Sequence, residues 1–319
     1  MRIVVLGAGG ARKTEASIVR AARALGHPCR LVDVVGWVRH TGRSSGRIVR
    51  FLTDKFQPSF LILTRHAIRV GEPTLKWLLQ GRDAVFWYFD PQPHEDVLTL
   101  GRLVGRMCVT YLAQLEFYRR AGVGRVDFMP QGVDPERDYP AKLALAWERC
   151  DTSFVGSGQY PYRHSLLSAV ASVSRMHIRG PGWENAPPDL PVVGGPVHGR
   201  RLARVIRGAA ISLGASAHPE QDADRASASN RMWKILGSGG FYLGKHVPDI
   251  ECFAIHGTHC AWYRSVDEAT QMTTYYLREP EERIRIALAG RAHALAQHTY
   301  ADRLRLLLQG SGYPLHTIL

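Results

Sequence analysis

Residues 2–27 read RIVVLGAGGARKTEASIVRAARALGH and combine two hydrophobic patterns. The first part is a continuous apolar run that ends in glycines, which is typical of a buried strand followed by a tight turn. The second part carries apolar residues at helical spacing and stops at Gly26, which is typical of an amphipathic helix. A strand, a glycine turn and a helix in this order predict an α/β fold built on a parallel sheet.

The same alternation continues along the chain. Strand-like runs follow at CRLVDV (29–34), PSFLILT (58–64), DAVFWYFD (83–90), RMCVTYL (106–112) and RVDFMP (125–130). The pattern pauses at the polar, proline-bearing residues 131–151 and restarts with TSFVGSGQYPYRHSLLSAVASV at residues 152–173. We therefore predict two doubly wound domains, residues 1–145 and 146–319, that face each other across a cleft and end in C-terminal helices.

The composition is that of a globular protein. Of 319 residues, 45% are hydrophobic and 22% are charged, and the length suffices for two domains. The five cysteines form no C-x-x-C pair, which argues against a zinc site or a disulfide framework. No apolar run has the length of a membrane span, and no signal peptide precedes the first strand-like run. We expect a soluble, cytoplasmic protein.

The charge balance favours anionic partners. Lysine and arginine number 41 against 28 acidic residues, which gives a formal net charge of +13. Such a surplus attracts nucleotides, phosphorylated lipids, membrane surfaces or nucleic acid over long range. The arginines are spread along the chain and form no blocks, so a solvated, arginine-rich surface is the alternative interpretation.

The first glycine loop, GAGGAR at residues 7–12, has two interpretations. A dinucleotide site needs glycines at three fixed places and an acid about twenty residues further on. Gly7, Gly9 and Asp33 fit that pattern, but Arg12 stands at the third glycine position. We favour a tight turn that lets a substrate approach the backbone, with a nicotinamide or flavin cofactor as the alternative. The residues assigned to this acceptor-side loop are Gly9, Gly10, Arg12 and Glu15.

The segment WYFDPQPHED at residues 87–96 is the candidate source of a general base. A strand-like run ends there in an acid and two prolines follow, an arrangement that projects side chains toward a ligand site. The side chains able to act as bases are Asp90, His94, Glu95 and Asp96. The alternative is a solvated proline turn capped by Asp90. Asp90 and His66 are the predicted catalytic residues.

Two further segments predict a phosphate site. In SFVGSGQYPYRHSLL (153–167), Arg163 stands at a helix start, and SNRMWKILGSGG (229–240) places small polar residues and two cations at another. Helix starts offer unpaired N–H groups and a partial positive charge. Arg231 and Lys234 are three residues apart and share one helical face. The alternatives are a plain strand-to-helix turn and an ordinary capped helix. The predicted donor-binding residues are Gly156, Ser157, Gly158, Arg163, Gly180, Ser229, Asn230, Arg231 and Lys234.

The order of five motifs resembles the glycosyltransferases of the CgeB-like, spore-maturation type, which belong to the group-one transferases with the GT-B architecture. The motifs are RRAGVGRVDFMPQGVDPE (119–136), DTSFVGSGQYPYRHSLL (151–167), HIRGPGW (177–183), SNRMWKILGSGGFYL (229–243) and REPEERIRIALAGRAHALAQHTYADRLRLLL (278–308). The resemblance covers the chain from about Trp87 onward.

The resemblance implies two Rossmann-like domains, with a nucleotide-sugar such as a UDP-sugar held mainly by the second and an acceptor reached from the first. The family's arginines fall on Arg163 and Arg231. Related transferases carry a ribose-binding glutamate where this chain has Lys234, and a second glutamate where it has Ala226. The ribose contact and the choice between retention and inversion stay open.

The expected chemistry needs neither a metal nor a cofactor, because arginine, lysine and helix N-termini can stabilise the diphosphate leaving group. We expect the one D-x-D pair, Asp222 and Asp224, to be solvated and not a metal site. The acceptor is unknown and could be anionic or a nucleic acid. The alternative functions are a glycosyltransferase acting on nucleic acid, a nicotinamide-dependent oxidoreductase and a nucleic-acid-binding protein.

Overall fold

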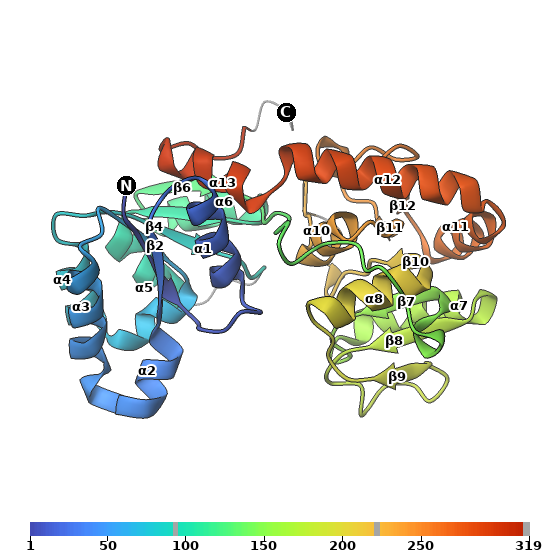
Figure 1. Ribbon diagram of the computed structural model, residues 1–319, viewed down its shortest axis with the longest axis horizontal. Coiled ribbons are helices and arrows are strands. Elements are labelled where there is room, and N and C mark those ends of the chain that lie inside the picture. Colours follow the sequence, from blue (N-terminus) through green and yellow to red (C-terminus); the bar gives the residue numbers. More distant parts are fainter. Residues whose placement is uncertain (92–94, 220–223, 315–319) are drawn as a thin grey trace. The chain divides into compact units, whose positions relative to one another are not determined.

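The computed structural model describes residues 1–91, 95–219 and 224–314 of the chain. The chain divides into two compact units (Figure 1). Unit 1 contains Met1–Gln131 and the C-terminal segment that begins at Tyr300, and unit 2 contains Gly132–Thr299. Among the residues so described, no helix combines the length and the apolar character needed to cross a membrane.

Unit 1 is built on a six-stranded parallel sheet of order β2-β1-β3-β4-β5-β6. Its elements are β1 (Ile3–Gly7), α1 (Thr14–Ala24), β2 (Cys29–Asp33), α2 (Val34–Thr41), η1 (Gly42–Ser44), α3 (Ser45–Phe56), β3 (Phe60–Leu63), η2 (Arg65–Val70), α4 (Glu72–Leu79), β4 (Asp83–Tyr88), α5 (Glu95–Val104), β5 (Arg106–Val109), α6 (Ala113–Arg120), β6 (Arg125–Phe128) and α13 (Tyr300–Leu308).

Helices α1 and α13 cover one face of this sheet and close a core with it. The apolar face of α1, which includes Ile18 and Ala22, packs against Ile3 and Val5 of the sheet. The last helix contributes apolar residues at positions i, i+4 and i+7, namely Tyr300, Leu304 and Leu307, and all three are buried in the same core. The core of unit 1 therefore needs residues from both ends of the chain.

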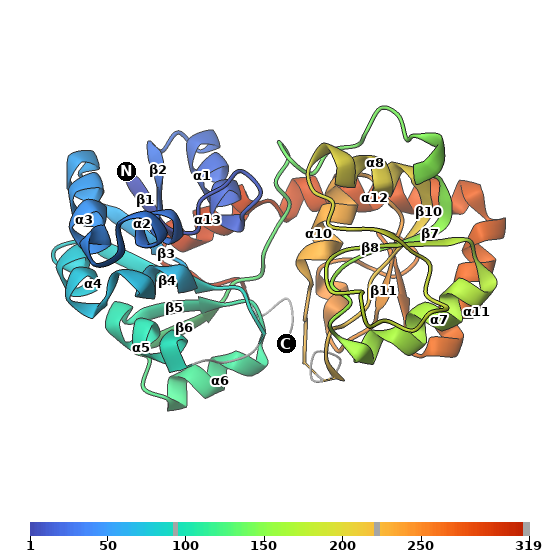
Figure 2. The same ribbon diagram turned by 90° about the horizontal axis from the view of Figure 1, so that it is seen from below.

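Unit 2 is built on a second six-stranded parallel sheet of order β12-β11-β10-β7-β8-β9. Its elements are η3 (Ala146–Glu148), β7 (Cys150–Val155), η4 (Pro161–Arg163), α7 (His164–Val173), β8 (Met176–Arg179), β9 (Val192–Gly194), α8 (Arg200–Gly208), β10 (Ala209–Leu213), α10 (Asn230–Gly237), β11 (Tyr242–Lys245), η5 (Ile250–Cys252), β12 (Ala261–Tyr263), α11 (Val266–Arg278) and α12 (Pro280–Gln297). Figure 2 shows this sheet with its helices from a second direction. The predicted α/β class and the two parallel sheets are confirmed.

The observed division differs from the predicted boundary at residue 145 in two places. Residues 132–145 belong to unit 2, where Val133 pairs with Thr299 and its N–H donates to the carbonyl oxygen of His298 (2.8 Å). The C-terminal tail, expected to belong wholly to the second domain, is shared between the units. Helix α12 ends before His298, and the apolar face of α13 is buried against α1 and the first sheet.

Candidate functional site

A pocket of about 280 Å³ lies at the carboxyl ends of β7, β8 and β10 in unit 2. The chain runs outward from β7 to β8 and β9, and then returns to β10 on the other side of β7. In open α/β sheets, ligands bind beyond the carboxyl ends of the strands at such a reversal of strand order. The pocket therefore occupies the position where this fold binds ligands.

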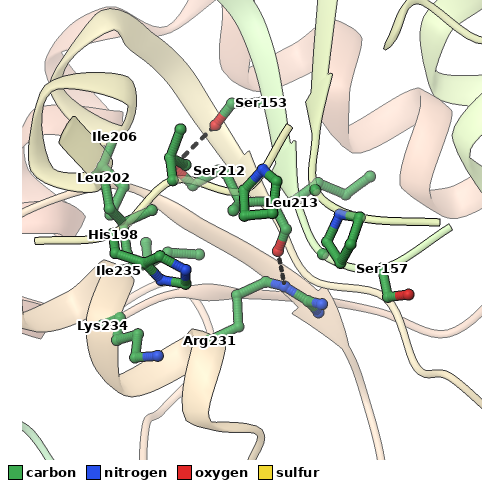
Figure 3. A pocket seen from close by; sticks show the side chains of 16 residues that line it. Ser153, Ser157, His198, Leu202, Ile206, Ser212, Leu213, Arg231, Lys234 and Ile235 are labelled. Atoms are coloured by element: carbon green, nitrogen blue, oxygen red, sulfur yellow. Dashed lines mark hydrogen bonds between the residues drawn. The ribbon is translucent and has the colours of Figure 1, made fainter. Parts of the chain in front are cut away.

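The floor and one wall of the pocket are built from β7, β10 and α8. Ser153 of β7 and Ser212 of β10 are both buried, and their hydroxyl oxygens lie 3.4 Å apart across the strand reversal. Leu202 and Ile206 of α8, with Ile235 of α10, add an apolar wall (Figure 3). The pocket thus combines an apolar side with hydroxyl groups at its floor.

The positively charged part of the pocket comes from α10. Arg231 lines the pocket and donates from Nε to the carbonyl oxygen of Val155 (2.9 Å) and from Nη1 to that of Ala215 (3.0 Å). Its guanidinium also lies over the ring of Phe154, with Cζ 4.5 Å from the ring centroid. These contacts join the ends of β7 and β10 and hold the guanidinium at the pocket.

Lys234 lies one turn further along α10 and lines the same pocket, with His198 beside it (Figure 3). Burial, together with the positive charges of Arg137 and Arg231, lowers the pKa of Lys234 to about 8, and Asp138 partly offsets this shift. Among the described residues that line the pocket, none is acidic. The pocket therefore carries net positive charge at neutral pH.

Arg163 lies next to this pocket without lining it. Its side chain is 5% exposed and donates to the carbonyl oxygens of Ser157 (3.0 Å) and Ser216 (3.3 Å). Burial and the neighbouring Arg231 lower the pKa of Arg163, but a guanidinium in a protein keeps its proton. Both guanidinium groups contact the ring of Phe154. Two arginines thus share one aromatic ring at the edge of the pocket.

The predicted glycines allow two loops to approach each other. A Cβ atom on Gly156 would meet Nη2 of Arg231 at 2.6 Å, and one on Gly158 would meet the carbonyl oxygen of Gly182 at 2.4 Å. Gly180 has a φ of +148°, and a Cβ atom there would lie 1.8 Å from the carbonyl oxygen of Gly156. Only glycines fit where the loops after β7 and β8 meet, and this packing forms one rim of the pocket.

The predicted donor-binding residues fall into two groups. Those that line the pocket are Gly156, Ser157, Gly180, Arg231 and Lys234. Those that do not line it are Gly158, Arg163, Ser229 and Asn230. Ser229 caps α10 by accepting a hydrogen bond from the N–H of Met232, and α7 begins only after the 3-10 turn η4, so the pocket is bordered by the flank of α10 and not by two helix starts.

The sequence patterns did not predict several residues that line the pocket. These are Ser153, Ser212, His198, Leu202, Ile206 and Ile235. The one signal available for the serines was a small polar residue inside each of two strands that are otherwise largely apolar. Their pairing spans 59 residues of sequence and depends on the strand order, which the sequence patterns did not predict.

In unit 1, two acids from neighbouring elements, Glu15 of α1 and Asp33 at the end of β2, bind the backbone of the first glycine loop. Oε1 of Glu15 is buried and accepts hydrogen bonds from Ala8 N–H (3.0 Å) and the Thr64 hydroxyl (2.8 Å). Oδ1 of Asp33 accepts from the N–H of Gly9 (2.7 Å) and of Gly36 (2.9 Å). Both carboxylates therefore hold the loop in place. Gly10 and Arg12 of the same loop are exposed.

Asp90 follows β4 and forms an ion pair with Arg65, Nη1 to Oδ2, at 2.5 Å, with both side chains about half exposed. Gln114 donates to the carbonyl oxygens of Asp90 (2.9 Å) and Pro91 (2.7 Å). His66 lies beside Arg65 in η2, and burial lowers its pKa, with Glu15 acting in the opposite direction. His66 and Asp90 therefore follow neighbouring strands at the carboxyl edge of the first sheet.

Two remaining candidate acids lie at the start of α5, and Asp96 interacts electrostatically with Arg65. Glu95 and Asp96 lie in the first turn of α5, where negative charge stabilises a helix, and His94 lies outside the described residues. Asp222 of the D-x-D pair also lies outside them, and Asp224 is buried, contrary to the expectation of a solvated loop. Within residues 1–91, 95–219 and 224–314, no group of three or more His, Cys, Asp or Glu side chains is arranged to hold a metal ion.

The chain is similar to known glycosyltransferases. Residues 163–309, which include Arg231 and Lys234, match a family model described as "Glycosyl transferase-like". Solved structures of other proteins are similar to nearly the whole chain. The Anabaena protein HepE in complex with UDP-glucose has a TM-score of 0.68 at 11% identity, over 97% of this chain and 99% of that chain.

A glycosyltransferase from Rickettsia africae ESF-5 has a TM-score of 0.65 at 11% identity, over 97% of each chain. A sucrose-phosphate synthase from Thermosynechococcus elongatus has a TM-score of 0.65 at 13% identity, over 97% of this chain and 98% of that chain. The fold is GT-B. The comparison with curated proteins gives no match. The predicted enzyme class, a glycosyltransferase, is confirmed by the family match together with this fold.

Proposed function

We propose that the protein transfers a sugar from a nucleoside-diphosphate sugar to an acceptor, and that the diphosphate of the donor binds in the pocket of unit 2. The observation that carries this proposal is the placement of Arg231 and Lys234 in a pocket at the strand reversal, with no acidic residue among the described residues that line it. UDP-sugars are the first donors to test, because HepE binds UDP-glucose.

Sugar transfer breaks the bond between the anomeric carbon and the phosphate oxygen, so negative charge builds up on the departing diphosphate. The guanidinium of Arg231 and the ammonium of Lys234 would stabilise that charge in a partly dehydrated site. The guanidinium of Arg163, which also lies over the ring of Phe154, adds positive potential near the pocket. We propose that these cations make the reaction independent of a metal ion, and that the sugar nucleotide is a substrate with no resident cofactor beside it.

On the acceptor side, we propose Asp90 or His66 as the base that removes a proton from the attacking hydroxyl. The lowered pKa of His66 favours the neutral imidazole at pH 7, which is the form that accepts a proton. Asp90 is half exposed, and its pairing with Arg65 fixes the direction of the carboxylate. The residues Gly9, Gly10 and Arg12 would border the acceptor, and Glu15 would act by holding their loop in place.

The finer assignment to the CgeB-like type is also a proposal. It is supported by the order of the five motifs, and by the fact that Arg231 of the fourth motif lines the donor pocket. The nicotinamide alternative is not favoured, because the carboxylate of Asp33 that would hold a ribose hydroxyl accepts two backbone hydrogen bonds instead.

A nucleotide panel tests the proposal. Thermal unfolding should be followed with UDP, GDP, dTDP and NADH, because a ligand that binds only the folded state raises the melting temperature. We expect at least one nucleoside diphosphate to raise it and NADH to leave it unchanged. A shift with NADH alone would favour the oxidoreductase, and no shift with any nucleotide would contradict the donor site.

Lys234 should make nucleotide binding depend on pH. Its pKa of about 8 means that the free protein loses this charge as the pH rises through 8, whereas a bound phosphate favours the protonated form. The affinity for UDP should therefore fall by up to about tenfold between pH 7 and pH 9, as measured by isothermal titration calorimetry. The phosphate itself ionises near pH 6, below this range.

Two substitutions isolate this effect. Lys234→Arg keeps the charge throughout and should bind with nearly constant affinity, whereas Lys234→Met should bind weakly at both pH values. Because the pKa of Lys234 is below its usual 10.5, the charged lysine costs stability below pH 8, and this cost is relieved as the pH rises toward 10.5. Lys234→Met should thus be more heat-stable than the parent at pH 7. Equal pH dependence in the parent and Lys234→Arg would contradict the assignment.

A further inference from the structure

Helix α8 carries its charged and apolar residues on opposite faces. Ala203, Val205 and Ile206 are buried in unit 2. The opposite face carries four arginines at positions 200, 201, 204 and 207, and three of these, Arg200, Arg201 and Arg207, are exposed. The spacing of i, i+4 and i+7 for residues 200, 204 and 207 places them in one row along the helix. The outer face of α8 is therefore a strip of positive charge.

The loop that precedes β7 packs against this strip and exposes two large apolar side chains. A Cβ atom on Gly208, at the end of α8, would meet the carbonyl oxygen of Glu148 at 2.5 Å. The buried carboxylate of Glu148 also pairs with Arg204, Nε to Oε1, at 3.4 Å. Figures 1 and 2 both show this part of the chain passing α8. On the same loop, Leu143 is 76% exposed and Trp147 is 68% exposed.

We define the α8 patch as Leu143, Trp147, Arg200, Arg201, Arg204 and Arg207, and we propose that it binds the surface of an anionic lipid membrane. Exposed tryptophan is unusual on a surface that stays in water, whereas at a bilayer surface its ring lies among the headgroups. Arginines beside it attract anionic headgroups. Within the part of the chain that the structure describes, the acid paired with this strip is Glu148, through Arg204.

The apolar part of the patch favours lipid over nucleic acid as the occupant. Aromatic side chains and arginine serve both kinds of ligand, because bases stack on them. An aliphatic side chain as exposed as Leu143 gains little from a phosphate backbone but gains free energy when it leaves water for the acyl region of a bilayer. The α8 patch therefore combines the two contributions that peripheral membrane binding needs.

This placement would bring the donor pocket close to the membrane surface. Leu202 and Ile206, on the inner face of α8, line the pocket, and the arginines lie on the outer face of the same helix. The α8 patch is thus separated from the donor pocket by the width of one helix. Membrane binding does not depend on sugar transfer, so its test is independent of the proposed function.

The experiment measures co-sedimentation of the full chain with vesicles of phosphatidylcholine alone and of phosphatidylcholine mixed with phosphatidylglycerol. We expect binding to the mixed vesicles and little to the neutral ones. Each arginine near an anionic surface contributes about fivefold in partitioning. Arg201→Glu with Arg207→Glu should therefore weaken binding by at least about tenfold. Leu143→Ser with Trp147→Ser should weaken vesicle binding by a similar factor. At high salt, which screens the attraction of the arginines, this double variant should no longer bind.

A control uses another exposed aromatic with a neighbouring arginine, Phe51 and Arg47 on α3 of unit 1. Arg47→Glu with Phe51→Ser combines one charge reversal and one aromatic-to-serine change of the same kinds, and it should bind vesicles as the parent does. The proposal is overturned if this control loses as much binding as the α8 patch variants, or if the parent does not bind mixed vesicles. It is also overturned if the α8 patch variants lose binding only to a single-stranded oligonucleotide.

Discussion

Replacing Arg231 with alanine is expected to weaken UDP binding by about tenfold to a hundredfold, because a charge-assisted hydrogen bond to phosphate contributes about 1.5–3 kcal/mol. The guanidinium is held by the carbonyl oxygens of Val155 and Ala215 and by the ring of Phe154, so it needs little reorganisation to meet the diphosphate. The change should appear in the dissociation constant measured by calorimetry.

The control for this substitution is Arg207→Ala on α8. This substitution also removes a guanidinium, but from the exposed outer face of α8. The inner face of α8 forms a wall of the pocket. Arg207→Ala should bind UDP like the parent, and circular dichroism should show both variants folded. If folded Arg231→Ala binds UDP as tightly as the parent, the diphosphate does not bind at Arg231.

Asp90→Asn is expected to lower turnover by about a hundredfold or more, because a positioned general base contributes at least that much to the rate. UDP affinity should be unchanged, because Asp90 belongs to unit 1 and the donor pocket is built from unit 2. The measurement is the release of UDP from a UDP-sugar at saturating donor, with water or a hydroxyl compound as acceptor. The asparagine keeps the size of the side chain but cannot take the proton.

Asp54→Asn is the matched control in the same unit. Asp54 pairs with Arg82 at 2.9 Å and its side chain is 46% exposed, close to the 45% of Asp90 in its pair with Arg65. Loss of an exposed ion pair costs little stability, so Asp54→Asn should turn over normally. If Asp90→Asn also turns over normally, Asp90 only orients Arg65 and the base is elsewhere or absent.

Most of the fold could be predicted from local pattern because most strands are short, largely apolar runs bounded by turn residues; β9 was not predicted. The same local information predicted that Arg231 and Lys234 share a helical face, and both line the pocket. The shared tail could not be predicted this way. Residues 281–308 carry helix-forming patterns throughout, and only the buried contacts of Tyr300, Leu304 and Leu307 with the first core show that α13 belongs to unit 1.

The directions of individual side chains were the least predictable part of the site. Arg163 stands at a helix start as expected. Its guanidinium donates hydrogen bonds to the carbonyl oxygens of Ser157 and Ser216, however, and does not line the pocket. Glu15 and Asp33 have the chemistry of functional acids, but backbone N–H groups of the glycine loop occupy both carboxylates. Such hydrogen bonds join residues distant in sequence, and no local pattern encodes them.

A crystal structure of the protein with UDP bound would test the proposed donor site most directly. The diphosphate should lie at the carboxyl ends of β7 and β10, within hydrogen-bond distance of Arg231 and next to Lys234 and the loop of Gly156 and Ser157. A nucleotide bound instead at the Gly7–Arg12 loop of unit 1, with its ribose near Asp33, would contradict this placement.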